Sequence, residues 1–79
     1  MSNRYNINLF WSNEDDSWIA DVPDLKYCSA HGPTAEDAAR EIQVAMGAWL
    51  EVAAEGGQPI PEARYRPAIY AVNDGVRAA

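Results

Sequence analysis

The chain has little positive charge, and no stretch of it is uniformly apolar over a long distance. Its 79 residues include 6 Lys and Arg against 12 Asp and Glu, which gives a formal net charge of −6. Nucleic-acid binding uses clustered Lys and Arg that neutralise phosphates, and only Arg64 and Arg66 lie near each other here. We therefore expect no direct nucleic-acid binding by this chain alone. The acidic balance favours either simple solubility or a basic partner.

Cysteine is also scarce. A single cysteine, Cys28, excludes an internal disulfide and fits a reducing compartment. No apolar run approaches the roughly 18 residues of a membrane span, and the N-terminal residues lack the basic start and apolar run of a signal peptide. We expect a cytoplasmic protein without membrane contact. A chain this short buries only about 60% of its unfolded surface, so we expect one small domain that forms a homo-dimer or tetramer.

What the chain does contain is an ordered series of strand signals. Apolar residues alternate over residues 5–11 (YNINLFW) and 18–22 (WIADV), with the polar turn SNEDDS between them. This pattern predicts a β-hairpin. Pro23 ends the second strand because proline cannot donate to the ladder. Residues 27–31 (YCSAH) predict a short third strand, which Gly32-Pro33 ends.

A long helix is predicted over residues 35–55. Thr34 is a good N-cap, Asp37 completes a capping pattern, and Gly56-Gly57 supplies a stop. Apolar residues recur at three- and four-residue steps as one stripe: Ala38, Ile42, Ala45, Met46, Trp49, Val52 and Ala53. The predicted fold class is α+β with the order β-β-β-α, an antiparallel sheet covered by one helix.

Several short motifs occur in a particular order. VPDL follows the hairpin, Cys28 comes five residues after Pro23, HGPTAEDA leads into the helix, and QPIPE follows it. This ordered set resembles the HicB-like antitoxin family over residues 5–62. The resemblance implies a partial, degenerate ribonuclease-H-like fold without ribonuclease activity. It also implies a partner, a small basic toxin of the HicA type that cleaves messenger RNA and that such antitoxins bind and silence.

The chain departs from the family pattern at three places. Lys26-Tyr27 stands where the family has Pro-Gly, Pro33 replaces the Asp of G-D-T, and Ala63 replaces the last Pro of I-P-E-P. Because tyrosine adopts the positive φ of a glycine only at a cost, the geometry of the loop before the third strand is left open. Many such antitoxins carry a helix-turn-helix or ribbon-helix-helix. The residues after Glu55 are too few for one, so we expect no operator binding.

Under the same resemblance, residues 1–62 form the HicB-like domain and residues 63–79 form a tail. Three alternatives stay open for the segment AIYAV and the residues after it: a fourth strand of the sheet, a partner-binding tail or a disordered end.

The stretch DVPDLKYCSAHGPTAEDA concentrates reactive side chains: Asp21, Asp24, Cys28, His31, Glu36 and Asp37. A ribonuclease-H-type nuclease needs several carboxylates around two metal ions, yet the first predicted strand offers Asn6 and Asn8 and no acid. A structural zinc site needs four N or S ligands, and Cys28 with His31 supplies two. Alternation places these two residues on opposite strand faces, so His31 cannot serve Cys28 as a base. We expect no catalytic residue, no cofactor and no metal, and hence no enzyme.

The candidate partner-binding residues combine acidic charge with exposed apolar surface: Trp11, Asp15, Asp16, Glu36, Val44 and Glu51. Among the tryptophans, Trp11 is expected to be exposed, whereas Trp18 and Trp49 are expected in the core. The acids would face lysines or arginines of a toxin through complementary shape and charge. The alternative is an orphan HicB-like domain that only homo-oligomerises, without a toxin partner and without catalysis.

Overall fold

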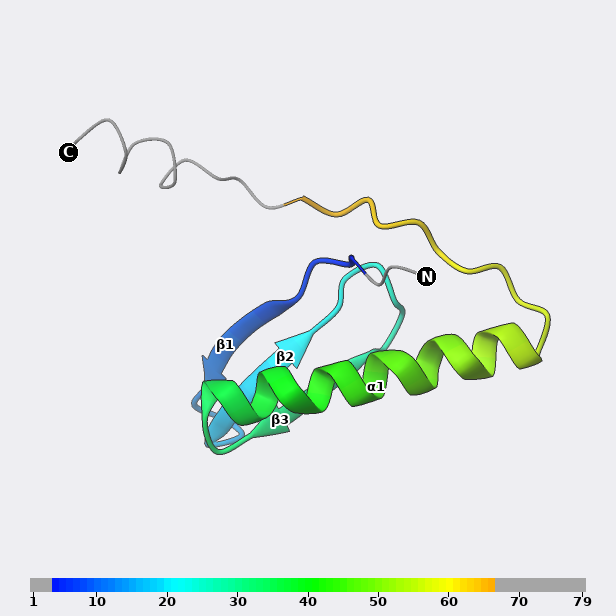
Figure 1. The fold of residues 1–79 in the computed structure, drawn as a ribbon. Coiled ribbons are helices and arrows are strands. Elements are labelled where there is room, and N and C mark those ends of the chain that lie inside the picture. Colours follow the sequence, from blue (N-terminus) through cyan, green and yellow to red (C-terminus); the bar gives the residue numbers. More distant parts are fainter. Residues whose placement is uncertain (1–3, 67–79) are drawn as a thin grey trace.

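A computed structural model describes residues 4–66 as two layers, a sheet and one helix (Figure 1). β1 (Asn8–Ser12), β2 (Ser17–Asp21) and β3 (Ser29–Gly32) form a three-stranded antiparallel sheet in the order β1-β2-β3. The helix α1 (Ala35–Glu55) covers one face of this sheet. The predicted α+β class and β-β-β-α order are confirmed. The segment AIYAV lies outside the described residues.

The hairpin register explains why β1 is shorter than predicted. Leu9 pairs with Ala20, and Asn8, the first residue of β1, pairs with Asp21. Continuing this register would place Asn6 opposite Pro23, which has no N–H to donate. Strand pairing therefore begins at Asn8 rather than at Tyr5. The alternation of the sequence still holds before the strand, because Tyr5 packs against the core.

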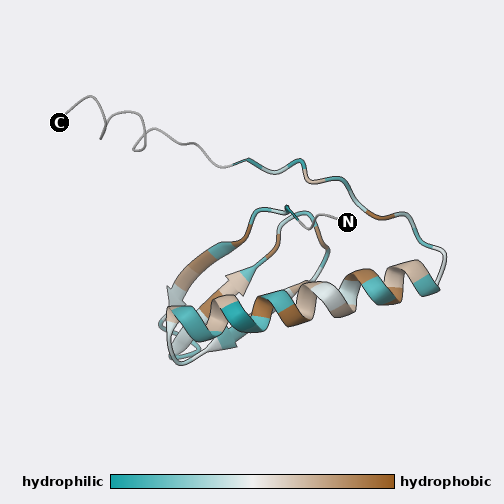
Figure 2. Ribbon diagram, in the orientation of Figure 1, coloured by the Kyte–Doolittle hydropathy of each residue, from teal (hydrophilic) through white to brown (hydrophobic). Residues whose placement is uncertain are grey.

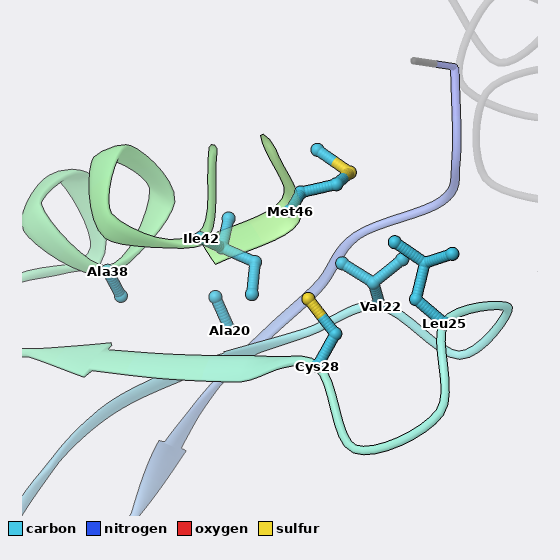
Figure 3. Close-up of a cluster of buried hydrophobic side chains, with 7 residues drawn as sticks. All are labelled: Ala20, Val22, Leu25, Cys28, Ala38, Ile42 and Met46. Atoms are coloured by element: carbon cyan, nitrogen blue, oxygen red, sulfur yellow. The ribbon is translucent and has the colours of Figure 1, made fainter. Parts of the chain in front are cut away.

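The core lies between the inner face of the sheet and the apolar stripe of α1 (Figure 3). Its buried members are Ala20, Val22, Leu25, Cys28, Ala38, Ile42 and Met46. Ala20 and Ala38 are both 0% exposed, and such small side chains let a helix lie close to a sheet. Figure 2 shows the corresponding alternation of hydrophobic and hydrophilic colour along α1. The core is small because one helix covers three short strands.

Both ends of α1 form as the sequence predicts. The Thr34 hydroxyl oxygen accepts a hydrogen bond from the Asp37 N–H at 3.1 Å. At the other end, Gly57 has a φ of 72°, and the N–H of Gln58 donates to the carbonyl oxygen of Ala53 at 2.9 Å. This is the Schellman arrangement, which favours glycine at the left-handed position. The helix bounds Ala35–Glu55 are those predicted.

The helix begins very close to the end of β3, and Gly32 makes this approach possible. A Cβ atom on Gly32 would lie 2.8 Å from the backbone nitrogen of Ala38 and 2.8 Å from Cβ of Asp37. No side chain fits into that space without moving the helix. Gly32 therefore sets the separation between the two layers at this end of the molecule.

The segment after α1 turns back along the molecule and contacts it at two points (Figure 1). The Tyr5 hydroxyl donates to the carbonyl oxygen of Pro61. Asp24 Oδ2 accepts hydrogen bonds from the N–H groups of Arg64 and Tyr65, both at 3.0 Å. Asp24, in the turn after β2, therefore holds the post-helical segment against the domain.

One member of the predicted apolar stripe is not in the core. Val52 is 68% exposed. It lies ten residues after the buried Ile42, and ten residues at 3.6 per turn leave the two side chains roughly 80° apart around the helix. Val52 therefore belongs to the predicted apolar stripe but lies outside the core.

Within residues 4–66, no helix combines the length and the apolar character needed to cross a membrane.

Candidate interaction surface

All six candidate partner-binding residues are exposed: Trp11, Asp15, Asp16, Glu36, Val44 and Glu51. The structure places them in two groups. Those of the hairpin lie at the end of the sheet where α1 also begins, so Glu36 lies at the same end of the molecule (Figure 1). Val44 and Glu51 lie farther along α1. At a rise of 1.5 Å per residue, Val44 is about 12 Å along the axis from Glu36.

Trp11 is exposed but held in a fixed position. Its ring packs edge to face against Trp18, with centroids 6.0 Å apart and an interplanar angle of 72°. Its indole N–H donates to Asn13 Oδ1 at 2.9 Å. Trp11 remains 43% exposed, whereas Trp18 and Trp49 are half-buried against the core. The predicted contrast between Trp11 and the other two tryptophans is confirmed.

The acids of the hairpin loop have local structural roles. Asp15 Oδ2 accepts a hydrogen bond from the Ser12 hydroxyl at 2.8 Å, and the Asp15 N–H donates to the same hydroxyl oxygen at 3.2 Å. Asp16 has a φ of 51°, a left-handed conformation that Asp tolerates better than most residues. Both side chains remain exposed. They therefore close the turn and also present negative charge at the end of the hairpin.

Cys28 and His31 lie on opposite sides of the sheet, as predicted. Cys28 is 4% exposed and belongs to the core, whereas His31 is exposed on the outer face. Burial raises the pKa of the Cys28 thiol, and the negative charge of Asp21 raises it further. The thiol is therefore protonated at neutral pH, which makes it a poor nucleophile. Among residues 4–66, no three His, Cys, Asp or Glu side chains gather closely enough to hold a metal ion.

The outer face of the sheet is largely polar. Its central row pairs Phe10 with Ile19 and Ile19 with His31 across the three strands. A hollow of about 280 Å³ beside this row is lined by Asp15, Ser17, Ile19 and His31. Two large apolar side chains thus stand among polar neighbours on this face.

A larger groove of about 490 Å³ lies between the C-terminal half of α1 and the residues that lead into β3. Its apolar lining comes mainly from Tyr27, Cys28, Ala45, Ala48, Trp49 and Val52, and Ser29 and Gln58 add polar groups. No local sequence pattern predicts this groove, because its walls come from segments about 20 residues apart. The four-residue spacing of Ala48 and Val52 indicates only its helical wall.

Tyr27, on the wall opposite the helix, has an unusual backbone conformation. Its φ is 63°, and the Cys28 N–H donates to the Leu25 carbonyl oxygen at 3.1 Å across it. A positive φ at the third position of a four-residue turn is the type II pattern, which favours glycine. The chain therefore adopts the left-handed conformation at a position where glycine is ordinarily favoured. For a residue with a Cβ, that conformation costs about 1–2 kcal/mol.

The Tyr27 side chain has few contacts that offset this strain. The residue is 92% exposed. The Lys26 ammonium lies over its ring face, 5.4 Å from the ring centroid. At an exposed site such a cation–π contact stabilises by about 0.5–1 kcal/mol. A strained and exposed aromatic residue therefore stands at the side of the groove.

The fold and these surfaces define a small α+β domain with acidic exposed residues and one apolar groove. Comparison with protein-family models, with curated proteins and with solved structures gives no match for this chain.

Proposed function

We propose that this chain is an antitoxin-like binding module of the HicB-like kind. It would neutralise a small basic toxin of the HicA type, which cleaves messenger RNA, by protein–protein contact. The observation that carries the proposal is the ordered motif set, VPDL, Cys28, HGPTAEDA and QPIPE, in a chain with a net charge of −6. The finer fold, a partial ribonuclease-H-like domain, belongs to the same proposal. A β-β-β-α order is compatible with it.

The mechanism is occlusion. A toxin that binds RNA needs positive charge on its surface, since phosphates are bound by Lys and Arg. An acidic domain meets that surface with complementary charge, which speeds association and fixes orientation. In this proposal the chain itself performs no catalysis and needs no cofactor. Its place of action is the cytoplasm, where the toxin meets messenger RNA.

The alternative is an orphan domain that only associates with itself. Its structural support is the outer edge of β3, which no other strand of residues 4–66 covers. The Val22 N–H donates to the Cys28 carbonyl oxygen at 3.0 Å, and hydrogen-bonded pairs alternate along an antiparallel ladder. The backbone groups of Ser29 and His31 therefore point away from β2. Such an edge can pair with another strand, although a strand as short as β3 limits this.

The test measures the mass of the full chain by size-exclusion chromatography with light scattering. The chain is run alone and after co-expression with the product of the adjacent reading frame. A stoichiometric complex with a small basic protein supports the antitoxin proposal, and a discrete homo-oligomer that ignores the neighbour supports the orphan alternative. RNA cleavage by the neighbour's product, unchanged at saturating concentrations of this chain, would refute neutralisation.

A further inference from the structure

Several local structural preferences are violated beside the groove between α1 and the turn before β3. Tyr27 is held at a positive φ beside it. The last turn of α1 contains no basic residue, and it contains Glu55, although the helix dipole disfavours negative charge there. Val52, 68% exposed, lines the groove, and Val44, 67% exposed, lies about two turns earlier on the helix. Departures of this kind concentrate at functional sites, where binding rather than folding selects the residue.

The charges around the groove have one predominant sign. The segments that border it, residues 26–29 and 41–58, contain three acids, Glu41, Glu51 and Glu55, and a single basic residue, Lys26. Neighbouring positions on a helix surface are three and four residues apart. Glu41 therefore adjoins Ala45 and Val44, Glu51 adjoins Ala48, and Glu55 adjoins Val52.

This charge distribution disfavours a second copy of the chain as the occupant. In a two-fold dimer the same patch meets itself. The three glutamates of one copy would then approach those of the other, with one lysine on each side to oppose them. Like charges placed opposite one another across an interface are unfavourable. The net charge of −6 adds a repulsion between the two whole chains.

We propose that the groove between α1 and the turn of Tyr27 is the docking site for a basic protein segment, with apolar side chains that enter the groove and Lys or Arg that flank them. A volume of about 490 Å³ accommodates large apolar side chains, and such buried anchors dominate binding energies. Tyr27 covers the anchor from one side, and Glu51 and Glu55 pair with the flanking cations. The identity of the natural partner rests on the proposed function, whereas the apolar and acidic character of the groove does not.

The test uses the full chain labelled with ¹⁵N and two synthetic peptides. One peptide is an amphipathic sequence of leucine and lysine, and its matched control replaces every lysine with glutamate. We expect the lysine peptide alone to give saturable shift changes at Tyr27, Ser29, Ala48 and Val52 and at the indole N–H of Trp49. Changes centred on the outer sheet face or the hairpin loop, equal binding of both peptides, or no binding would overturn the inference.

Variants locate the site and separate its two kinds of contact. Val52→Glu places a charge in the apolar groove and is expected to weaken the lysine peptide at least about tenfold. Glu55→Lys should weaken it several-fold while slightly stabilising the helix, because it improves the charge at the C-terminus. Glu14→Lys changes the net charge equally in the exposed hairpin loop, away from the groove, and should leave affinity within about twofold. Equal weakening by Glu14→Lys and Glu55→Lys would mean non-specific electrostatic attraction and would overturn the site.

Two other occupants give distinct results in the same experiment. Chemical-shift changes at the groove residues that grow with protein concentration, without peptide, would identify a second copy as the occupant of the groove. Differences in the same chemical shifts between a chain ending at residue 66 and the full chain would identify the chain's own C-terminal segment as the occupant. Both results overturn the inference. If the peptide binds but the chain forms no complex with the neighbour's product, only the proposed function is refuted. If the complex forms and persists with Val52→Glu, only the docking site in the groove is refuted.

Discussion

The indole N–H of Trp49 donates a hydrogen bond to the main-chain carbonyl oxygen of Lys26 at 2.9 Å. This bond joins the middle of α1 to the turn that precedes β3, across 23 residues of sequence. It therefore ties together the two walls of the apolar groove. A groove with tied walls is largely formed before binding, which reduces the ordering that a partner must bring about. The carbonyl group that accepts the bond belongs to Lys26, directly before Tyr27, so the bond also holds the turn on which Tyr27 lies.

Tyr27→Gly is expected to have a free energy of unfolding about 0.5–1 kcal/mol above that of Tyr27→Ala, because both variants lose the cation–π contact with Lys26 and only glycine relieves the left-handed strain. Relief of the left-handed strain contributes about 1–2 kcal/mol, and the greater freedom of glycine in the unfolded chain removes roughly 0.5–1 kcal/mol of it. Little burial is lost, because the residue is 92% exposed. Urea titration measures the difference. Tyr27→Ala is the matched control, because it keeps a Cβ and hence the strain. Equal stability of the two variants would show that the left-handed φ is not costly here.

The same Tyr27→Gly variant should bind the leucine–lysine peptide about threefold or more weakly, since aromatic anchors are enriched among residues that dominate binding. Titration of the variant under the conditions used for the unmodified chain makes the comparison. An unchanged affinity would remove Tyr27 from the docking site.

Ile42→Ala should lower the free energy of unfolding by about 2–5 kcal/mol, through lost burial and the cavity left behind. Ile42 is 0% exposed and lies in the centre of the helix stripe. For a domain of this size such a loss is a large fraction of the total stability. Val44→Ala deletes methyl groups two residues away at a site 67% exposed, and should change stability by less than about 0.5 kcal/mol. Comparable losses in the two variants, measured by thermal unfolding, would contradict the packing described for α1.

The first turn of α1 should show a pH-dependent stabilisation. Hydrogen bonds from the side chains of Arg40 and Thr34 lower the pKa of Asp37, and Arg40 Nη1 lies 2.8 Å from Asp37 Oδ1. A lowered pKa in the folded state stabilises the fold above the pKa of an unfolded Asp, about 3.9. The contribution is lost as the pH falls through the lower folded value. Asp37→Asn and Arg40→Gln should therefore both be less stable than the unmodified chain at neutral pH.

The two differences should disappear as the pH falls from about 4 towards 2, because the carboxyl group of the unmodified chain is then protonated as well. Melting temperatures over this pH range make the measurement. A stability difference for Asp37→Asn that is the same at pH 7 and pH 2 would assign its effect to something other than the carboxylate charge.

Asp24→Ala should release the segment that follows α1. The Asp24 carboxylate accepts N–H hydrogen bonds from Arg64 and Tyr65, and the variant leaves both donors to solvent. We expect faster trypsin cleavage after Arg64, because proteolysis requires the local chain to leave the domain surface. Glu62→Gln is the control, since the exposed Glu62–Arg64 pair at 3.5 Å should contribute little. Unchanged cleavage of Asp24→Ala would show that these bonds do not hold the segment.

The helix could be predicted from the sequence to its end residues, because its signals are local. Thr34 at the N-cap and Gly57 just past the end specify the two termini, and the spacing of buried residues such as Ile42 specifies the inner face. The strand ends were less predictable. Alternation in the sequence continues back to Tyr5, but pairing depends on what stands opposite, and the register would place Pro23 opposite Asn6.

The candidate surface was predicted only in part. Val44 and Glu51 were recognised as exposed positions on α1, but the groove beside them was not. A groove depends on how residues 27–29 sit against the helix, and no local pattern specifies that distance. Val52 belongs to the apolar stripe but is exposed. The stripe of this long helix is wider than the surface that the short β3 covers. The sequence shows Tyr27 at the position where the HicB-like motif has glycine, but its backbone conformation could not be predicted from the sequence.

The position of Cys28 allows its thiol to report on local opening of the domain. It is the only cysteine of the chain, it lines the groove, and it is 4% exposed. A thiol reagent therefore reaches the sulfur mainly when the segment before β3 opens away from α1, so the labelling rate measures how often that local opening occurs. A bound segment in the groove would slow this labelling in proportion to its occupancy. The chain thus carries, without any engineering, a kinetic probe at the place where a partner is proposed to dock.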